Sequence, residues 1–182
     1  MIDPTKKEYE QPHPWINKVI NIFKKNEVEN VLDLGCGSGI HLEILAQNGF
    51  EATGIDFSPS AASIAEQRLK KSNLPGKVFV SEIHEKIIFL DDAEYDAVIA
   101  TDSIHYTDKE TFSKTIKEIN RILKTDGLFF GTVPSKEAII ENSEGQIFFA
   151  KEEILNLLNA TFQIIEFDLD IEKFFSFIGS EK

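Results

Sequence analysis

At 182 residues, 42% of them hydrophobic and 27% charged, the chain suits one globular domain and leaves little room for a second. Its formal net charge of -12 at pH 7 disfavours nucleic acid as a partner, because such partners are bound mainly through Lys and Arg on phosphates. The single cysteine excludes an internal disulfide framework and a cysteine-rich zinc site.

The chain carries no sign of a membrane or secretory segment. No apolar run approaches the roughly 20 residues that a membrane-spanning helix needs, and residues 1–15 lack the apolar stretch of a signal peptide. We therefore expect a cytoplasmic protein, with no membrane and no nucleic acid among its partners.

Helix and strand signals alternate along the chain. In the first half, apolar spacing predicts a helix over 15–23, a strand over 28–35, a helix over 38–48, a strand over 50–57, a helix over 59–71 and a strand over 77–83. In the second half it predicts a strand over 94–101, a helix from 107, a strand over 128–133, a helix over 151–159 and strands over 161–169 and 171–178. Ser58 and Pro59 form one helix-start signal, and Thr107 with Glu110 forms a capping box for another.

This order of elements predicts an α/β fold, a Rossmann-like and mainly parallel sheet of seven strands with helices on both faces. Only a short polar bend around Asp170 separates the last two strands, and it is too short for a crossover connection. These strands should therefore run antiparallel, as a hairpin at or near one edge. We expect a single domain over 1–182, with a lead-in and helix at 1–27 and a candidate substrate lid at 134–150.

A glycine-rich loop joins the first predicted strand to the next helix, in VLDLGCGSGI (31–40). Without Cβ atoms, Gly35, Gly37 and Gly39 let the backbone adopt positive φ and let a ligand touch the main chain. In an open parallel sheet, ligands bind at the carboxyl ends of the strands, where this loop should lie. A tight strand-to-helix turn without a ligand is the alternative.

Two carboxylates flank the loop. Asp56 ends the next strand, about 20 residues beyond the glycines, where an acidic side chain can accept both hydroxyls of a ribose. Asp33 precedes the first glycine and could accept from an ammonium group, whereas it would not help to hold a pyrophosphate. The pair therefore favours a ligand that has an amino-acid end and no phosphate.

At this point the residues resemble a known family. DLGCGSG with GIDFSP is similar to the first two motifs of the class I S-adenosylmethionine-dependent methyltransferases, and EINRILKTDGLFFGT (118–132) resembles the arginine-x-leucine-lysine-x-glycine-glycine stretch of that family. Asp126 replaces the first glycine of that stretch, within a turn. The resemblance implies S-adenosyl-L-methionine as cofactor and S-adenosyl-L-homocysteine as product. A nicotinamide oxidoreductase is a rival, but Ile40 stands where its G-x-G-x-x-G fingerprint needs the third glycine.

The resemblance also implies a cofactor-binding set. The loop should wrap the methionine part, Asp33 should hold its amino group, Asp56 the ribose, and Phe57 should pack on the adenine, although core packing is an alternative for Phe57. Glu82 and Ile83 should face the adenine edge, although Glu82 could instead be solvated, and Thr101 should lie against the sulfonium. The whole set is Asp33, Gly35, Cys36, Gly37, Ser38, Gly39, Asp56, Phe57, Glu82, Ile83 and Thr101. Cys36, which has no catalytic partner in the sequence, is interpreted as structural.

The acceptor side is predicted within TDSIHYTD (101–108). His105 is a candidate base, needed only if the acceptor arrives protonated, and pocket lining is its alternative role. Tyr106 could position an acceptor through its hydroxyl. No His, Asp, Glu or Cys residues have the spacing of metal ligands, so we expect no metal.

The substrate class is predicted from what the chain adds to the common sheet and from what it omits. The segments 9–15 and 134–150, either of which could close over the cleft as a lid, are short, and the Asn/Asp-Pro-Pro-aromatic motif of adenine and glutamine methyltransferases is missing. We expect a small-molecule acceptor, as in the compact bacterial enzymes of the type-11 or tellurite-resistance kind, and a monomer or homodimer. A protein that binds S-adenosylmethionine as a sensor or regulatory subunit without turnover is the alternative.

Overall fold

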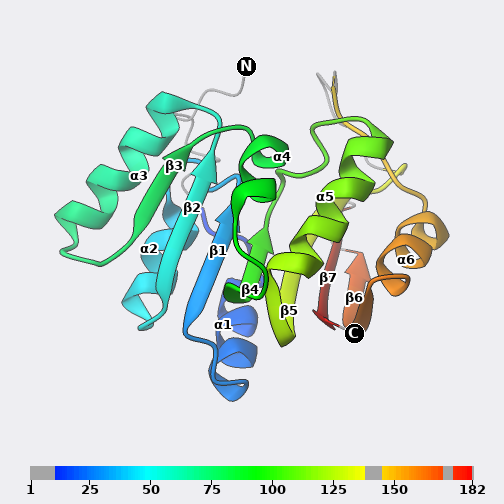
Figure 1. Cartoon of the computed structure of the whole chain (residues 1–182), viewed down its shortest axis with the longest axis horizontal. Helices are drawn as coiled ribbons and strands as arrows, with labels where there is room; N and C mark the ends of the chain where they lie inside the picture. The colour runs from blue at the N-terminus through cyan, green and yellow to red at the C-terminus, as the bar shows by residue number, and fades with distance from the viewer. Residues whose placement is uncertain (1–10, 138–144, 170–173, 182) are drawn as a thin grey trace.

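The computed structural model describes residues 11–137, 145–169 and 174–181. Its helices and strands follow the predicted alternation (Figure 1). In chain order they are α1 (Ile16–Lys25), β1 (Asn30–Leu34), α2 (Ile40–Gln47), β2 (Glu51–Asp56), α3 (Pro59–Lys71), β3 (Lys77–Val80), α4 (Ile83–Lys86), the 3-10 helix η2 (Ile87–Phe89), β4 (Tyr95–Ala100), α5 (Lys109–Ile122), β5 (Leu123–Pro134), α6 (Lys151–Asn159), β6 (Phe162–Leu169) and β7 (Phe174–Glu181). The bend predicted around Asp170 lies outside the described residues.

The seven strands form one sheet in the order β3-β2-β1-β4-β5-β7-β6. Strands β1 to β5 pair in parallel, whereas β7 lies antiparallel between β5 and β6. The predicted mainly parallel sheet with a reversed last strand is therefore confirmed, and β6 is the edge strand of the C-terminal hairpin.

Helices cover both faces of this sheet because β1 is apolar on both of its sides. Val31 packs in one cluster with Phe23 of α1 and Leu42 of α2, and Leu32 packs in the other cluster with Phe112 of α5. In Figure 1, α5 lies in front of the sheet and α1 behind it. None of the described helices is long and apolar enough to cross a membrane.

The strand order reverses between β1 and β4, which is the usual position of a ligand crevice in an open α/β sheet. From β1 the chain moves outward to β2 and β3, and from β4 it moves the other way to β5. The helix that follows β1 and the helix that follows β4 leave on opposite faces of the sheet. A crevice opens at the carboxyl ends of two strands where the strand order reverses in this way.

The structure corrects three local predictions. The fifth helix is capped by Asp108, whose carboxylate accepts from the Thr111 backbone N–H at 2.9 Å, so the capping box predicted at Thr107 is wrong. The turn before the fifth strand lies inside β5, where Asp126 has a φ of 63° and the pairing with β4 shifts register. The third strand ends at Val80, and the short helices α4 and η2 follow it.

Candidate functional site

The glycine loop begins where β1 ends, and each of its first two glycines meets a different surrounding. Gly35 has a φ of 78°, and a Cβ added to it would lie 2.3 Å from the Cβ of Ser103, in the loop after β4. Gly37 has a φ of 53°, and a Cβ added to it would have no protein atom within 4 Å. Gly35 is thus required by close packing across the crevice, whereas Gly37 presents bare backbone to open space.

Asp56, at the end of β2, is joined to the glycine loop by a hydrogen bond. It is buried, and its Oδ2 accepts from the Gly37 N–H while its Oδ1 accepts from the Ser58 N–H, each at 2.8 Å. Each carboxylate oxygen has further lone pairs, so the group can still accept from two hydroxyls of a ligand. The structure therefore brings Asp56 and the loop together at one point.

Asp33 on β1 is buried without a hydrogen-bond partner. Its side chain is 0% exposed, and neither carboxylate oxygen accepts a hydrogen bond from any residue that the structure describes. Burial, and then the charge of Asp56, raise the pKa of Asp33 to about 8. A buried carboxyl group of this kind is completed by a cation that donates hydrogen bonds, such as an ammonium group, which would also restore its ionised form.

Cys36 is buried in the loop and packs against β2. A Cβ added to Gly54 would lie 2.7 Å from the Cys36 sulfur. Burial raises the pKa of the thiol, and the neighbouring Asp33 and Asp56 raise it further. A protonated, buried thiol is a poor nucleophile, so the structure favours the packing role inferred from the sequence.

Arg68 in α3 fastens the second half of the loop, a role that the sequence analysis missed. Its Nε donates to the Ser38 carbonyl at 3.1 Å, and its Nη1 donates to Glu43 of α2 at 3.0 Å. Gly39 packs directly on Ala65, since a Cβ on Gly39 would lie 2.6 Å from the Cβ of Ala65. The loop is therefore held on one side by contacts with α3 and on the other by the Asp56 carboxylate.

The residues predicted for the adenine lie near the ends of β2 and β3. The Ser81 backbone N–H donates to the Asp56 carbonyl at 3.0 Å, which ties the two strand ends together. Phe57 is 57% exposed, so it does not pack in the core, and the alternative role considered for it is wrong. Glu82 is exposed and Ile83 half-buried at the start of α4. Contact of Phe57, Glu82 and Ile83 with a base stays a prediction.

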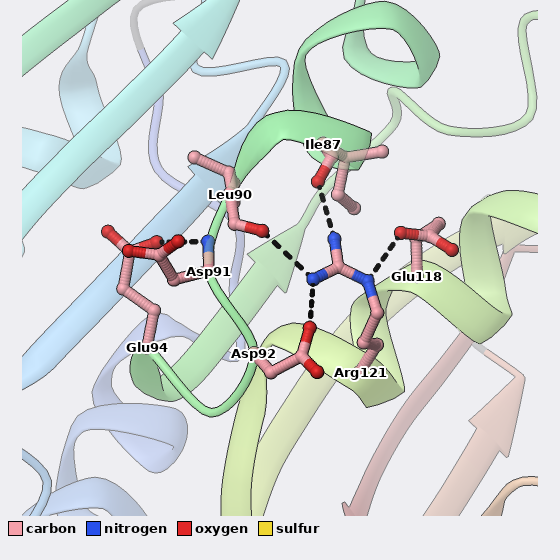
Figure 2. A network of polar contacts seen from close by, with 7 residues as sticks. All are labelled: Ile87, Leu90, Asp91, Asp92, Glu94, Glu118 and Arg121. Carbon is pink, nitrogen blue, oxygen red and sulfur yellow. Dashed lines mark hydrogen bonds and ion pairs between the residues drawn. The ribbon is translucent and has the colours of Figure 1, made fainter.

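Arg121 holds the segment that follows β3 against α5 (Figure 2). Its guanidinium donates to the carbonyls of Ile87 at 3.0 Å and Leu90 at 2.9 Å, and it pairs with the carboxylates of Glu118 at 2.7 Å and Asp92 at 2.5 Å. This arginine belongs to the motif noted at 118–132, but its partners come from 29 or more residues away or from its own helix. It fixes the short helices that follow β3, which begin at Glu82 and Ile83, the residues that are predicted to face the adenine edge and that we call the adenine wall.

On the acceptor side, the end of β4 is held by two hydroxyl groups. The Thr101 hydroxyl lies 3.1 Å from Nδ1 of His41, in the first turn of α2. Asp102 has a φ of 50°, and Thr132 of β5 accepts from its backbone N–H at 2.9 Å while donating to its carboxylate at 2.7 Å. The sequence analysis did not include His41 or Thr132, because neither belongs to a recognisable local motif.

His105 is buried and neutral beside the more exposed Tyr106. Its ring stacks on that of Tyr106 with centroids 4.6 Å apart, and Tyr106 is 43% exposed. Burial lowers the pKa of His105 to about 3. An imidazole with so low a pKa is a weak base at neutral pH, which favours the lining role over proton transfer.

The two candidate lid segments are described in part. Residues 9–10 of the first and 138–144 of the second lie outside the described residues. In the first, Trp15 stacks on Phe130 of β5 with centroids 5.8 Å apart. In the second, the Ile147 N–H donates to the His105 carbonyl at 3.0 Å, and Phe149 packs on Phe112. Among the described residues, no group of three or more His, Cys, Asp or Glu side chains is arranged to hold a metal ion.

Comparison with known proteins identifies the family of this architecture. A family model described as "Methyltransferase domain" matches residues 31–127. A Bacillus subtilis protein, YqeM, named provisionally as a methyltransferase, is 32% identical over 156 residues, which are 85% of this chain and 60% of that protein. The EEF1A lysine methyltransferase 2 of Homo sapiens is 28% identical over 171 residues, covering 87% of this chain and 65% of that protein. The chain therefore spans less than two thirds of the length of these relatives.

Solved structures share the fold at low identity. A protein of Pyrococcus horikoshii superposes with a TM-score of 0.80 at 21% identity and covers 99% of this chain and 94% of its own. The magnesium protoporphyrin IX methyltransferase of Synechocystis, solved with bound S-adenosylmethionine, superposes with a TM-score of 0.72 at 18% identity over 92% of this chain and 78% of its own.

Proposed function

Because the chain belongs to the class I S-adenosylmethionine-dependent methyltransferases, we propose that it transfers the methyl group of this cofactor to a small-molecule acceptor. The proposal is supported by two features that lie near each other at the carboxyl ends of the strands, a buried carboxyl group and a loop with exposed backbone. Asp33 is a buried carboxyl group that lacks a partner among the described residues, and Gly37 turns bare backbone to open space. The ammonium group of a ligand such as this cofactor would complete the hydrogen bonding of Asp33, and a ligand without a phosphate would fit against the Gly37 backbone.

The residues present fit this cofactor at each of its ends. Asp33 would hold the amino group, the backbone around Gly37 would contact the methionine part, and Asp56 would accept from the ribose hydroxyls with the lone pairs that its backbone bonds leave available. Phe57, exposed beside Asp56, would cover the adenine ring. The bound cofactor supplies an electrophilic methyl group whose leaving group is a neutral thioether.

The chain itself contributes alignment and exclusion of water. Thr101 and Asp102 are held by hydrogen bonds to His41 and Thr132, so an acceptor placed beside them would meet the methyl donor in a defined geometry. His105 serves as a neutral wall, and the Tyr106 hydroxyl is the group that can orient an acceptor. With so weak a base in the site, the acceptor has to arrive deprotonated or lose its proton to solvent after transfer.

A small molecule is favoured over a macromolecule by charge and by size. The net charge of -12 repels nucleic acids, and the two short additions to the sheet offer no docking domain. The relatives include a protein lysine methyltransferase and the structural neighbours a porphyrin methyltransferase, so a protein acceptor is the competing class to be tested.

The test is release of S-adenosylhomocysteine when the purified chain and the cofactor are incubated with a cell extract divided by size. We expect release with the small-molecule fraction and none with the protein fraction. Release with the protein fraction alone would contradict the proposed substrate class. Cofactor binding without release in either fraction would support a non-catalytic sensor instead.

A further inference from the structure

A line of hydrogen bonds crosses the crevice through His41. This residue lies in the first turn of α2, which follows β1, whereas Thr101 follows β4 on the other side of the point where the strand order reverses. The Thr101 Oγ1 lies 3.1 Å from the His41 Nδ1, and the backbone N–H of His13 donates to the His41 Nε2 at 2.9 Å. One side chain therefore joins both halves of the crevice to the segment before α1.

The chemistry of the partners fixes the direction of these bonds. A backbone N–H can only donate, so the His41 Nε2 carries no proton and accepts. Burial, and then the nearby His13, lower the pKa of His41 to about 4, so the ring is neutral at physiological pH and its one proton is on Nδ1. Thr101 Oγ1 consequently accepts from His41, and the Thr101 hydroxyl keeps its own hydrogen and a lone pair for a ligand.

The segment fastened by His41 is packed on aromatic surface. The His13 and Trp15 rings both contact Phe130 of β5, with centroids 5.6 Å and 5.8 Å away. The Trp15 N–H donates to the His13 Nδ1 at 3.2 Å, which keeps the two side chains in one arrangement. We call residues 11–15 the strap.

We propose that His41 is a positioning residue that orients the Thr101 hydroxyl toward the methyl-donor end of the cofactor and, with its other nitrogen, fastens the strap beside it. The inference rests on the proposed function for its cofactor half, since Thr101 is the residue expected against the sulfonium. Its strap half rests on the geometry alone. The Thr101 contact uses Nδ1 of His41 and the strap contact uses Nε2, so substitutions that keep one nitrogen position can test the two contacts independently.

The test uses side chains that replace one nitrogen at a time. An asparagine amide reaches the position of Nδ1, and a glutamine amide reaches that of Nε2. In His41→Asn we expect the bond to Thr101 to remain and the strap to loosen, and in His41→Gln the reverse. His41→Leu should lose both, and Asn156→Leu, at an exposed position of α6, is the control.

Two readouts follow the two halves. Trp15 is the single tryptophan of the chain, so acrylamide quenching of its fluorescence reports on the strap directly. Calorimetric titration with S-adenosylmethionine reports on Thr101. We expect quenching to rise in the Asn and Leu variants only, and affinity to fall about 3- to 10-fold in the Gln and Leu variants, as for loss of one hydrogen bond. Thr101→Val should add no further loss to His41→Gln.

The outcomes separate the inference from the proposed function. Equal quenching and equal affinity in the Asn and Gln variants would overturn the positioning role, because a purely structural defect does not discriminate between the two nitrogens. A wild-type chain that fails to bind S-adenosylmethionine would overturn the proposed function and the Thr101 half with it. The Trp15 readout would still decide the strap half in that case.

Discussion

The two sides of the crevice differ in how far their polar groups are satisfied by the protein itself. On the β4 side, Thr101 bonds to His41, Asp102 to Thr132, and the Ser103 hydroxyl to the Leu34 carbonyl. On the β1 side, Asp33 has no hydrogen-bond partner among the described residues.

This difference shows which part of the site needs a ligand to be complete. A buried carboxyl group without a partner is costly, so the β1 side is arranged for a ligand rather than for stability alone. On the β4 side these hydrogen bonds within the protein already hold Thr101, Asp102 and Ser103 in place. Removing one polar atom on the β1 side should therefore weaken cofactor binding strongly. On the β4 side, the position of the polar groups should depend more on contacts with distant residues.

The largest expected effect comes from Asp56→Ala. The change removes both ribose contacts and releases the Gly37 N–H, so affinity for S-adenosylmethionine should fall about 100-fold or more, as for two hydrogen bonds to a charged group. Asp96→Ala is the matched control, because Asp96 also accepts two backbone N–H groups, from Glu29 at 3.1 Å and Asn30 at 2.8 Å, at the start of β1. Equal affinity of the two variants, measured by calorimetry, would contradict the role of Asp56.

Asp33→Asn should weaken binding about 30-fold, since a charge-assisted bond to the amino group is lost. It should also change the pH dependence of stability. Because the pKa of Asp33 in the folded state is about 8 rather than 3.8, the folded state keeps a proton between about pH 4 and pH 8 that the unfolded state has lost. The wild-type chain should thus lose stability as pH rises through this window, by 2.303RT per unit at most.

The asparagine variant lacks this titration, so its thermal unfolding midpoint should exceed that of the wild type near pH 8 and approach it toward pH 4. Each 1 kcal/mol of stability difference would correspond to about 2–4 °C for a chain of this size. Parallel pH profiles for the two proteins would show that Asp33 is not the buried acid described here.

Gly37→Ala and Gly35→Ala should separate ligand contact from packing. At Gly37 the new methyl group meets open space, so the chain should fold with only the ~1–2 kcal/mol cost of positive φ, yet bind the cofactor about 10-fold more weakly. At Gly35 the methyl group meets Ser103, so the main loss should be in stability. Thermal melts and calorimetry on both variants test this, and unimpaired binding by Gly37→Ala would place the cofactor elsewhere.

The smallest effect is expected for Arg121→Met. It should free the short helices after β3 from α5 and weaken cofactor binding about 3- to 5-fold, because the adenine wall is no longer fixed. Lys124→Met removes a comparable ion pair, to Asp96 at 2.7 Å, away from the crevice. If both variants have the same dissociation constant for S-adenosylmethionine, Arg121 has only a structural role.

The fold and the cofactor loop could be predicted because their signals are local. Apolar periodicity gives the order of strands and helices, and the short bend after β6 forces an antiparallel pair. The glycines and the two aspartates lie within 24 positions of one another, so their spacing alone places them at neighbouring strand ends. The helix-start signal at Ser58 was also sufficient, and its hydroxyl does cap α3.

The rest depends on contacts between distant positions or on burial. His41 and Thr101 are 60 residues apart, and Arg121 reaches back more than 30 residues to Ile87. Helices as short as α4 leave no periodic pattern to detect, and Thr107 and Asp108 are both good cap residues, so their sequence does not choose between them. The role of His105 turned on a burial that its neighbours in the sequence do not reveal.

The most direct test of the central claim is calorimetric titration of the wild-type chain with S-adenosylhomocysteine and with NAD, each in two buffers of different ionisation enthalpy. If a buried, protonated Asp33 receives the amino group, binding of S-adenosylhomocysteine near neutral pH should release close to one proton, and NAD should not bind. Tight binding of NAD, or binding of S-adenosylhomocysteine without proton release, would contradict the account.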